Sequence, residues 1–285
     1  MTGFALDHLG IAVANLDDAA AQYRRLGFQL TDRGYHTLPP PKPGAERPLV
    51  GTGNHCAMLR RGYLELIGVT DPAYRGRLKA DIARYQGIHI VAFGVDDSAA
   101  VARAFAAAGL GAASPQILER PIETQGETAV ARFEIVNIPD QILPEGHFFA
   151  IRHATPELLW RPALMSHPNG ALKLTSLTVA VADPGDFARR LGHALSATPV
   201  AGSGFTLMLS AGQVRIVDGG WVAAHASKPT PAFPYIAGLT LQVADLAKTS
   251  SLLKKNGVPS RRSNGSLMVG PGQACGAFIE FQAEA

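Results

Sequence analysis

One pattern of apolar and polar positions occurs four times along the chain. It consists of a short strand with alternating apolar residues, a turn, an amphipathic helix and a glycine that ends the helix, which is Gly192 in the third copy. The four copies begin at Leu6, Ile90, Leu174 and Ile236. In the first copy, Leu9, Ile11 and Val13 alternate with His8, Gly10 and Ala12, and a period of two indicates a strand with two different faces. One face is expected to pack in the core, and the other can line a site.

The residues after the first strand predict a helix. Asn15 is suited to the N-cap, Asp17 and Asp18 place negative charge in the first turn, and Gly27 suits the left-handed position that ends a helix. Further strand-like runs follow, so each copy is expected to form a βαβββ module. In the first module, the Pro-rich segment 36–48 is expected to be a loop that is long enough to cover a pocket.

A repeated βαβββ module predicts an α+β fold in which modules pair. The segment 154–173, rich in proline and glycine, separates the second module from the third. We therefore expect two domains, 1–160 with modules one and two and 161–285 with modules three and four. Short connections favour the pairing of neighbouring modules. A pairing of modules one and four is the alternative, and it would bring Glu280 beside the residues of module one.

Composition excludes several classes of protein. Of the 285 residues, 47% are hydrophobic and 17% are charged, and the net charge is +3. The lysines and arginines are scattered, so no nucleic-acid partner is expected. We find no basic leader and no apolar run long enough to cross a membrane, and we expect a cytoplasmic protein. The cysteines Cys56 and Cys275 lie far apart, and we expect buried thiols rather than a zinc or redox pair.

The four copies differ at one inward position of the first strand, where only the first copy has a residue typical of metal ligands. The residues at this position are His8, Ile90, Ser176 and Gly238. The last strands align Glu65 with Glu280, Arg215 and Arg152, where the alignment of module two is open to a shift. An imidazole and a carboxylate on neighbouring strands are typical donors for a divalent cation, and they equally suit a structural hydrogen-bonded pair.

The segments DHLGIAVANLDDAAAQYRRLGF, GTGNHCAML and GYLELIGV resemble the first module of the vicinal oxygen chelate superfamily. This superfamily includes glyoxalase I, extradiol dioxygenases, methylmalonyl-CoA epimerase and the bleomycin- and fosfomycin-resistance proteins. TPELLW and HPNGALKLTSLTVAVADP are similar to its glyoxalase-like-domain branch. The resemblance implies modules paired into two cup-shaped mixed sheets with flanking helices. It also implies a divalent metal (Zn, Ni, Mn or Fe) inside the cup of modules one and two.

By this resemblance, His8 and Glu65 match the metal-ligand positions of module one, and Glu65 is also the catalytic carboxylate that moves a proton. Among the remaining histidines, His153 is the best further ligand because it ends the strand across the cup. His55 follows if its register is shifted, and it is otherwise a substrate-binding residue. Arg152 is expected to bind an anionic group of the substrate.

Three functions follow from the resemblance. The first is a metal-dependent lyase or isomerase that acts on a small oxygen-chelating or anionic metabolite. The second is an Fe(II) extradiol-type dioxygenase, which is weakened because only one histidine occupies a ligand position of the superfamily. The third is a non-catalytic protein that binds or sequesters a small molecule, as the resistance proteins do. The C-terminal half lacks the histidine in both modules, and we expect it to be a structural or dimerising half of a homodimer.

Overall fold

The computed structural model describes residues 3–42, 44–111, 114–124, 127–225 and 230–284. Within these residues the chain forms the four βαβββ modules that the repeated pattern predicts. The elements of module one are β1 (Ala5–Val13), α1 (Leu16–Arg25), β2 (Gly34–Thr37), β3 (Leu49–Met58) and β4 (Tyr63–Val69). Those of module two are β5 (Gly87–Gly94), α3 (Ser98–Ala107), β6 (Gln116–Thr124), β7 (Glu127–Asn137) and β8 (His147–His153).

The C-terminal half repeats this order with shorter strands. The elements of module three are β9 (Ala171–Ala180), α4 (Pro184–Leu195), β10 (Val200–Gly202), β11 (Gly204–Met208) and β12 (Gln213–Val217). Those of module four are β13 (Tyr235–Val243), α6 (Leu246–Lys255), β14 (Ser260–Ser263), β15 (Ser266–Val269) and β16 (Phe278–Ala283). The connecting helices are α2 (Arg77–Arg84), η1 (Pro156–Leu158), η2 (Pro162–Leu164), α5 (Gly219–His225) and η3 (Pro271–Gln273). The repeat pattern did not predict α2 and α5, because neither belongs to a module.

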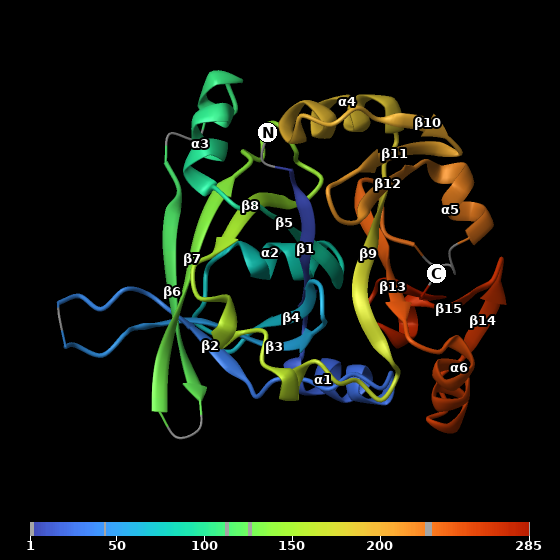
Figure 1. Cartoon of the computed structure of the whole chain (residues 1–285), viewed down its shortest axis with the longest axis horizontal. Coiled ribbons are helices and arrows are strands. Elements are labelled where there is room, and N and C mark those ends of the chain that lie inside the picture. Colours follow the sequence, from blue (N-terminus) through green and yellow to red (C-terminus); the bar gives the residue numbers. More distant parts are fainter. Residues whose placement is uncertain (1–2, 43, 112–113, 125–126, 226–229, 285) are drawn as a thin grey trace.

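Neighbouring modules pair through their first strands, β1 with β5 and β9 with β13, in both cases antiparallel. Each first strand runs parallel to the last strand of its own module, and the third and second strands follow outward. A pairing between Ile88 and Ile236 joins the two curved half-sheets. Figure 1 shows modules one and two on the left and modules three and four on the right. The predicted α+β fold of paired, cup-shaped sheets is confirmed.

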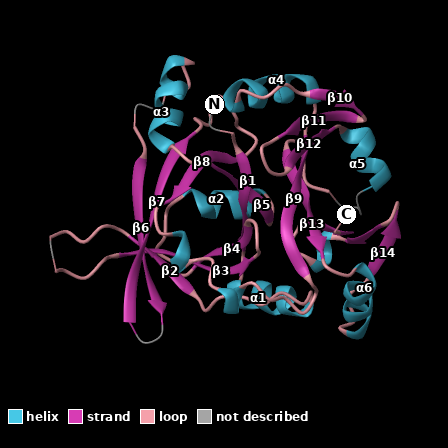
Figure 2. Ribbon diagram, in the orientation of Figure 1, coloured by secondary structure: helices cyan, strands magenta, loops and turns pink. Residues whose placement is uncertain are grey.

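The module helices α1, α3, α4 and α6 lie around the outside of the sheets (Figure 2). The apolar face of each first strand packs toward these helices, and one buried cluster contains Leu9 and Phe93 together with Phe187 and Leu241 of the other half. The boundary predicted at residue 160 falls between η1 and η2, and a division into two domains stays a prediction. In the described part of the chain, no helix is both long enough and apolar enough to span a membrane.

The predicted helix ends are correct in module one and wrong in module three. The Asn15 side chain accepts hydrogen bonds from the amides of Asp17 and Asp18, and Gly27 follows the helix with φ +85°. The repeat pattern takes Gly192 as the corresponding glycine of module three. Helix α4 instead continues to Leu195 and ends at Ser196, which adopts φ +51° itself.

The loop between β2 and β3 projects outward past β6 (Figure 1) and does not fold over the first cup. Arg47 near its end forms an ion pair with Glu119 of β6. Residue 43 of the predicted segment 36–48 lies outside the described residues. The sequence indicated only that segment 36–48 is long enough to cover a pocket, and the described part of the loop between β2 and β3 lies beside β6 instead.

Candidate functional site

A β-bulge on β1 brings two polar side chains to one place in the first cup. Leu6 pairs with Phe93 and His8 with Ala92, so Asp7 is an extra residue that has no partner on β5. Such a bulge breaks the strict alternation of side chains along a strand. Consequently Asp7 reaches its own neighbour, and its Oδ1 lies 2.7 Å from His8 Nδ1. Register shifts also interrupt the pairing of β9 with β13, where Ala237 corresponds to Asp7.

His153, at the end of β8, completes this cluster from across the cup. Its Nε2 lies 3.1 Å from Oδ1 and 3.2 Å from Oδ2 of Asp7. Its Nδ1 is buried and has no hydrogen-bond partner among the described residues, so Nε2 is the nitrogen presented to Asp7. Donor atoms of Asp7, His8 and His153 all lie within 4.8 Å of one another. The structure thus brings together His8 and His153, as predicted, and adds Asp7.

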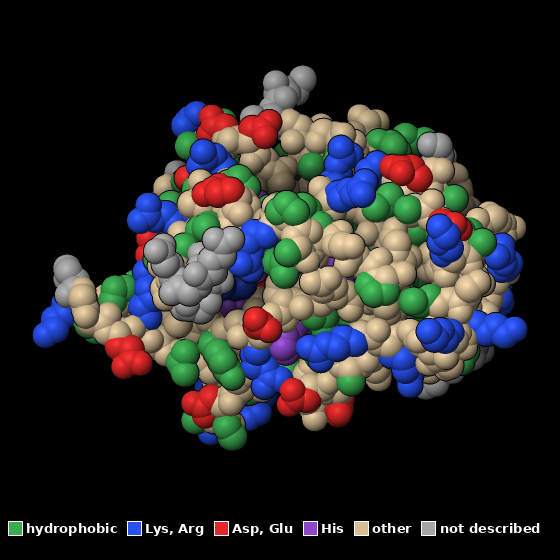
Figure 3. All heavy atoms as spheres, turned by 60° about the horizontal axis from the view of Figure 1, so that its bottom comes forward, with side chains coloured by type: hydrophobic (Ala, Val, Ile, Leu, Met, Phe, Trp, Pro, Cys, Tyr) green, Lys and Arg blue, Asp and Glu red, His purple; other side chains and the backbone are tan. Residues whose placement is uncertain are grey.

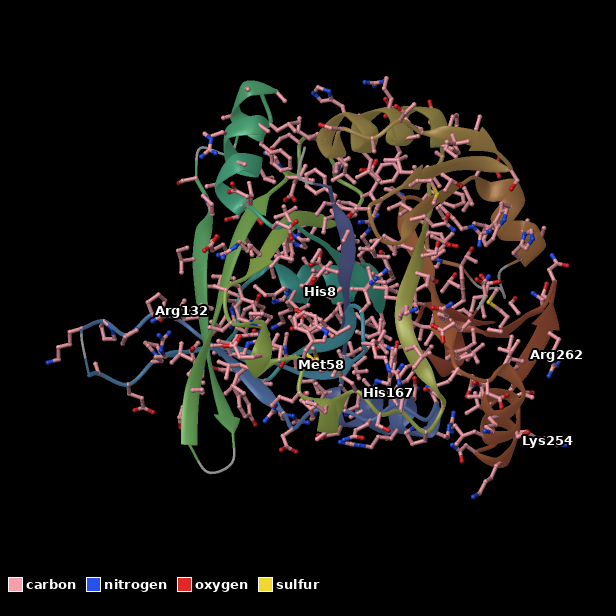
Figure 4. The ribbon with its side chains drawn as sticks, in the orientation of Figure 1. His8, Met58, Arg132, His167, Lys254 and Arg262 are labelled. Carbon is pink, nitrogen blue, oxygen red and sulfur yellow. The ribbon has the colours of Figure 1, made fainter. Side chains whose placement is uncertain are left out.

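Aromatic rings surround the cluster and hold its imidazoles in place. The Tyr63 ring stacks on His8 at 4.2 Å between centroids, and Phe149 approaches His8 edge-on at 5.8 Å. Trp160 lies edge-on to His153 at 4.8 Å. His8 is 4% exposed. Figure 4 shows His8 on β1 near the middle of the molecule.

The electrostatics of the cluster favour an ionised carboxylate. Burial opposes ionisation of Asp7, but the hydrogen bonds from His153 and His8 outweigh it and hold the pKa of the carboxyl well below its usual range. Asp7 is therefore an anion that faces two imidazoles. Two imidazole nitrogens and a carboxylate oxygen are also the donors that hold non-haem iron.

Glu65 lies on β4 beside this cluster but is bound by other partners. It pairs with Gly10, two residues beyond His8 on β1, which corresponds to roughly 7 Å along the strand. Asn54 donates a hydrogen bond to it, and His36 Nε2 and Arg120 lie at 3.6 and 3.7 Å.

Burial would raise the pKa of Glu65, but the His36 and Arg120 side chains hold it well below the usual range. Glu65 is therefore also ionised. It forms a second polar cluster with Asn54, His36 and Arg120, and it does not belong to the Asp7 group.

Two predicted substrate-binding residues do not face the cup. The register pairs Phe149 with Ala92, as Glu65 pairs with Gly10, so Phe149 occupies the place expected for Arg152. Arg152 lies on the opposite strand face, where its guanidinium donates to Glu134 at 2.8 Å. This corrects the alignment of the last strand of module two.

His55 also lies away from the cup, beside segment 31–33, which precedes β2. Its Nδ1 lies 2.9 Å from the Thr31 carbonyl and its Nε2 is 3.4 Å from Arg33. It is one residue from Asn54, which faces Glu65, so the alternation of β3 turns it outward. The register shift that would have brought His55 inward does not occur.

The linker between the halves covers the first cup. Leu158, Leu159 and Trp160 pack against the apolar side chains of its interior, and Leu164 and Met165 pack beside Tyr63. Segment 156–165 therefore packs over the interior of the first cup.

The corresponding positions of the second cup hold a different set. Ser176 and Gly238 stand at the places that correspond to His8, as expected from the sequence. Arg215 and Glu280 stand at the places that correspond to Glu65, and they form an ion pair at 3.6 Å. Thr240 donates a further hydrogen bond to Glu280 at 3.1 Å. Because Glu280 lies in this cup, the alternative pairing of modules one and four is wrong.

The fold and the position of the site inside a cup of βαβββ modules define a protein of the vicinal oxygen chelate superfamily. More particularly, residues 6–195 match the model of the family described as Glyoxalase-like domain. The chain belongs to this family. No curated protein matches the sequence.

Solved structures with the same fold extend over nearly the whole chain. A hypothetical protein from Staphylococcus aureus is similar with a TM-score of 0.66 and 13% identity, over 99% of this chain and 100% of that one. A mutant of 4-hydroxymandelate synthase from Streptomyces coelicolor has a TM-score of 0.58 and 14% identity, over 100% and 95%. A fusion of a xylose isomerase-like TIM barrel with 4-hydroxyphenylpyruvate dioxygenase has a TM-score of 0.56 and 11% identity. The match covers 98% of this chain and 48% of that one. At these identities the likeness shows the fold alone.

Proposed function

We propose that this protein is a divalent-metal-dependent enzyme that uses Asp7, His8 and His153 to hold its metal in the first cup. The observation that carries the proposal is the convergence of His8 Nδ1 and His153 Nε2 on the Asp7 carboxylate, at 2.7 and 3.1 Å. Donors about 2.1 Å from one ion and at right angles to each other lie roughly 3 Å apart. The donor set therefore fits a divalent cation both in chemistry and in spacing.

The donor set favours a different reaction from the one that the sequence favoured. A lyase or isomerase was favoured over a dioxygenase because only His8 occupied a ligand position of the superfamily. Two imidazoles and a carboxylate are typical of Fe(II) oxygenases, so an Fe(II)-dependent dioxygenase is now the better supported reaction. Two of the structural neighbours are 4-hydroxymandelate synthase and a 4-hydroxyphenylpyruvate dioxygenase fusion, which agrees with this choice.

The residues around the cluster indicate how a substrate would be held. The rings of Tyr63, Phe149 and Trp160 suit an aromatic body, since they offer flat apolar surfaces. Arg120 beside Glu65 supplies positive charge for an anionic oxygen, and the ionised Glu65 can accept a hydrogen bond from a hydroxyl. When bound, the iron would supply the redox chemistry and a docking point for two adjacent oxygens. The substrate class is therefore a small oxygenated aromatic compound.

The proposal is tested first by metal content. The protein is stripped with chelator, titrated without oxygen with Fe(II), Mn(II), Ni(II) or Zn(II), and analysed by elemental analysis after desalting. We expect one Fe(II) per chain in the wild type. Asp7→Asn, His8→Gln and His153→Gln should each weaken binding by about tenfold or more. Ser176→Ala, at the matching position of the second cup, serves as the control and should bind like the wild type.

Glu65→Gln distinguishes the two sets of ligands. It should retain the metal if Asp7 is the carboxylate ligand, whereas loss of metal in Glu65→Gln with retention in Asp7→Asn would support the ligand set expected from the sequence. Absence of stoichiometric metal in every preparation would refute the enzyme and leave a binding protein. For the loaded protein, oxygen uptake with a panel of catechols separates the dioxygenase from a lyase or isomerase, which consumes no oxygen.

A further inference from the structure

A second hollow lies in the C-terminal half, away from the Asp7 cluster. It has a volume of about 890 Å³, within the range of small-molecule sites. Its wall comes from four strands and its rim from α1, α5 and the segments before β5 and β16. The wall residues used below are Tyr235, Ala237, Arg261, Met268 and Phe278.

The wall of this hollow is apolar and aromatic. Tyr235, Ala237 and Phe278 are 3, 4 and 5% exposed and belong to one apolar cluster, against which Met268 and Trp221 pack. The Trp221 and Phe278 rings lie 6.1 Å apart. Such a wall suits the flat apolar body of an aromatic ligand.

The rim of the hollow is rich in hydrogen-bond donors. The side-chain carbonyls of Gln22, Gln86 and Gln273 accept hydrogen bonds from Cys275 N, Ala14 N and the Arg25 guanidinium, respectively. Because their oxygens are engaged in this way, these amides have their N–H groups left to donate.

The charged side chains that line the hollow also favour an anionic ligand. The described lining residues include the guanidinium of Arg261 and the imidazole of His225 but no carboxylate. A ligand in this hollow would therefore meet positive charge and N–H donors, which match an anionic group.

The polar side chains at the ligand positions of the second cup satisfy one another. Arg215 pairs with Glu280, its guanidinium lies 5.2 Å from the Trp221 ring centroid, and Thr240 donates to Glu280. Among the described residues, the cluster of metal-type ligands lies in the first cup. The second cup is therefore suited to binding without chemistry.

We propose that this hollow is a second ligand site, which binds a small aromatic anion. The rings of its wall take the aromatic body, and Arg261 with the glutamine amides takes the anionic group. The site is independent of the metal proposed for the first cup. It gives the C-terminal half a binding role in place of the purely structural or dimerising one expected from the sequence.

The two tryptophans of the chain, Trp160 and Trp221, allow the two cups to be observed separately. In Trp160→Phe, tryptophan fluorescence reports only from Trp221 beside the hollow. We would titrate this variant with 1-anilinonaphthalene-8-sulfonate and with the uncharged N-phenyl-1-naphthylamine, and follow energy transfer from Trp221. We expect one saturable site for the sulfonate, with an affinity about tenfold higher than that of the uncharged analogue.

Matched variants in the Trp160→Phe background decide the location. Arg261→Gln should weaken sulfonate binding by about tenfold, whereas Arg262→Gln should not. Arg262 is the next residue on β14 but does not line the hollow, and it lies at the outer rim of the molecule (Figure 4). Ala237→Phe should abolish binding because its ring fills the hollow.

Circular dichroism, which these variants should leave unchanged from that of Trp160→Phe, shows that they fold. Equal binding of the two probes, or unchanged sulfonate binding in both Arg261→Gln and Ala237→Phe, would overturn the proposal. Loss of binding in Arg262→Gln to the same extent as in Arg261→Gln would also overturn it, because it would indicate general surface charge. Because the readout needs no metal, failure here is distinct from failure of the proposed function.

Discussion

Replacement of His167 should destabilise the fold and change its dependence on pH. His167 lies in the linker between the halves and is 8% exposed. Its Nδ1 accepts a hydrogen bond from Gln29 N at 3.1 Å, and its Nε2 donates to the Met58 carbonyl at 2.8 Å. The Gln29 contact requires an unprotonated Nδ1, so the ring is the neutral Nε2–H tautomer. Figure 4 labels His167 and Met58, which lie close together below His8.

The magnitude follows from the two backbone groups that lose their partner. Leaving a buried donor or acceptor unsatisfied costs about 1–3 kcal/mol, so His167→Phe, which keeps a ring, should lose about 2–6 kcal/mol. His167→Ala should lose more, since it also leaves a cavity. The assay is urea unfolding followed by circular dichroism. The control is His193→Ala, an exposed histidine of α4, which should change the free energy of unfolding by less than about 0.5 kcal/mol.

The pH dependence supplies a second measurement. Burial lowers the pKa of His167 below its ordinary 6.5, although the bond to Met58 acts in the opposite direction. The unfolded chain therefore binds this proton more readily, and the stability that His167 contributes is complete above pH 6.5 and is lost as the pH falls below it. The difference between wild type and His167→Phe should accordingly shrink from pH 7.5 to pH 5.5. Equal stability of wild type and His167→Phe, or a difference that grows toward acid pH, would refute this reasoning.

Further substitutions test other parts of the structure. Gly27→Ala should cost several times as much stability as Gly257→Ala. Both glycines have positive φ, and an alanine in that conformation costs about 1–2 kcal/mol at either position. Only at Gly27 would the added Cβ also clash, because it would lie 2.4 Å from the Leu252 side chain. Equal losses in urea unfolding would contradict this. Arg190→Met should cost about 3–5 kcal/mol because it leaves the 4% exposed Glu145 without its ion-pair partner, while Arg189→Met, 72% exposed, should be nearly neutral. Burial raises the pKa of the Cys56 and Cys275 thiols to about 12. Iodoacetamide at pH 8 should therefore label neither thiol in the native protein and both after unfolding. Rapid labelling of either thiol in the native protein would count against this.

The charged side chains are interspersed with other groups on the face that Figure 3 shows. On the face shown in Figure 3, the lysine and arginine side chains are interrupted by acidic, apolar and uncharged groups and form no continuous basic stripe. The absence of a nucleic-acid partner stays a prediction from the sequence. The small net charge of +3 is therefore spread out rather than concentrated on this face.

Local rules account for the parts of the fold that could be predicted. Alternating Leu9, Ile11 and Val13 define the strand, Asn15 begins α1 and Gly27 ends it, since each effect involves only neighbouring residues. The same alternation places His8 and Glu65 in one cup once the modules pair. The prediction of helix ends from glycine fails in module three. There Ser196 adopts the left-handed conformation that the pattern assigns to Gly192.

The candidate site shows what only the tertiary structure decides. A strict period of two turns Asp7 away from His8, and the sequence LDHLG contains no signal that interrupts it. A bulge belongs to a pair of strands, because an extra residue exists only relative to the partner, and the partner β5 lies some 80 residues further along the chain. Pairing of β1 with β5 therefore places Asp7 beside His8, and the parallel pairing of β5 with β8 brings His153 to the same carboxylate. The sequence alone identified the module and its histidine, whereas the register between distant strands selected the carboxylate.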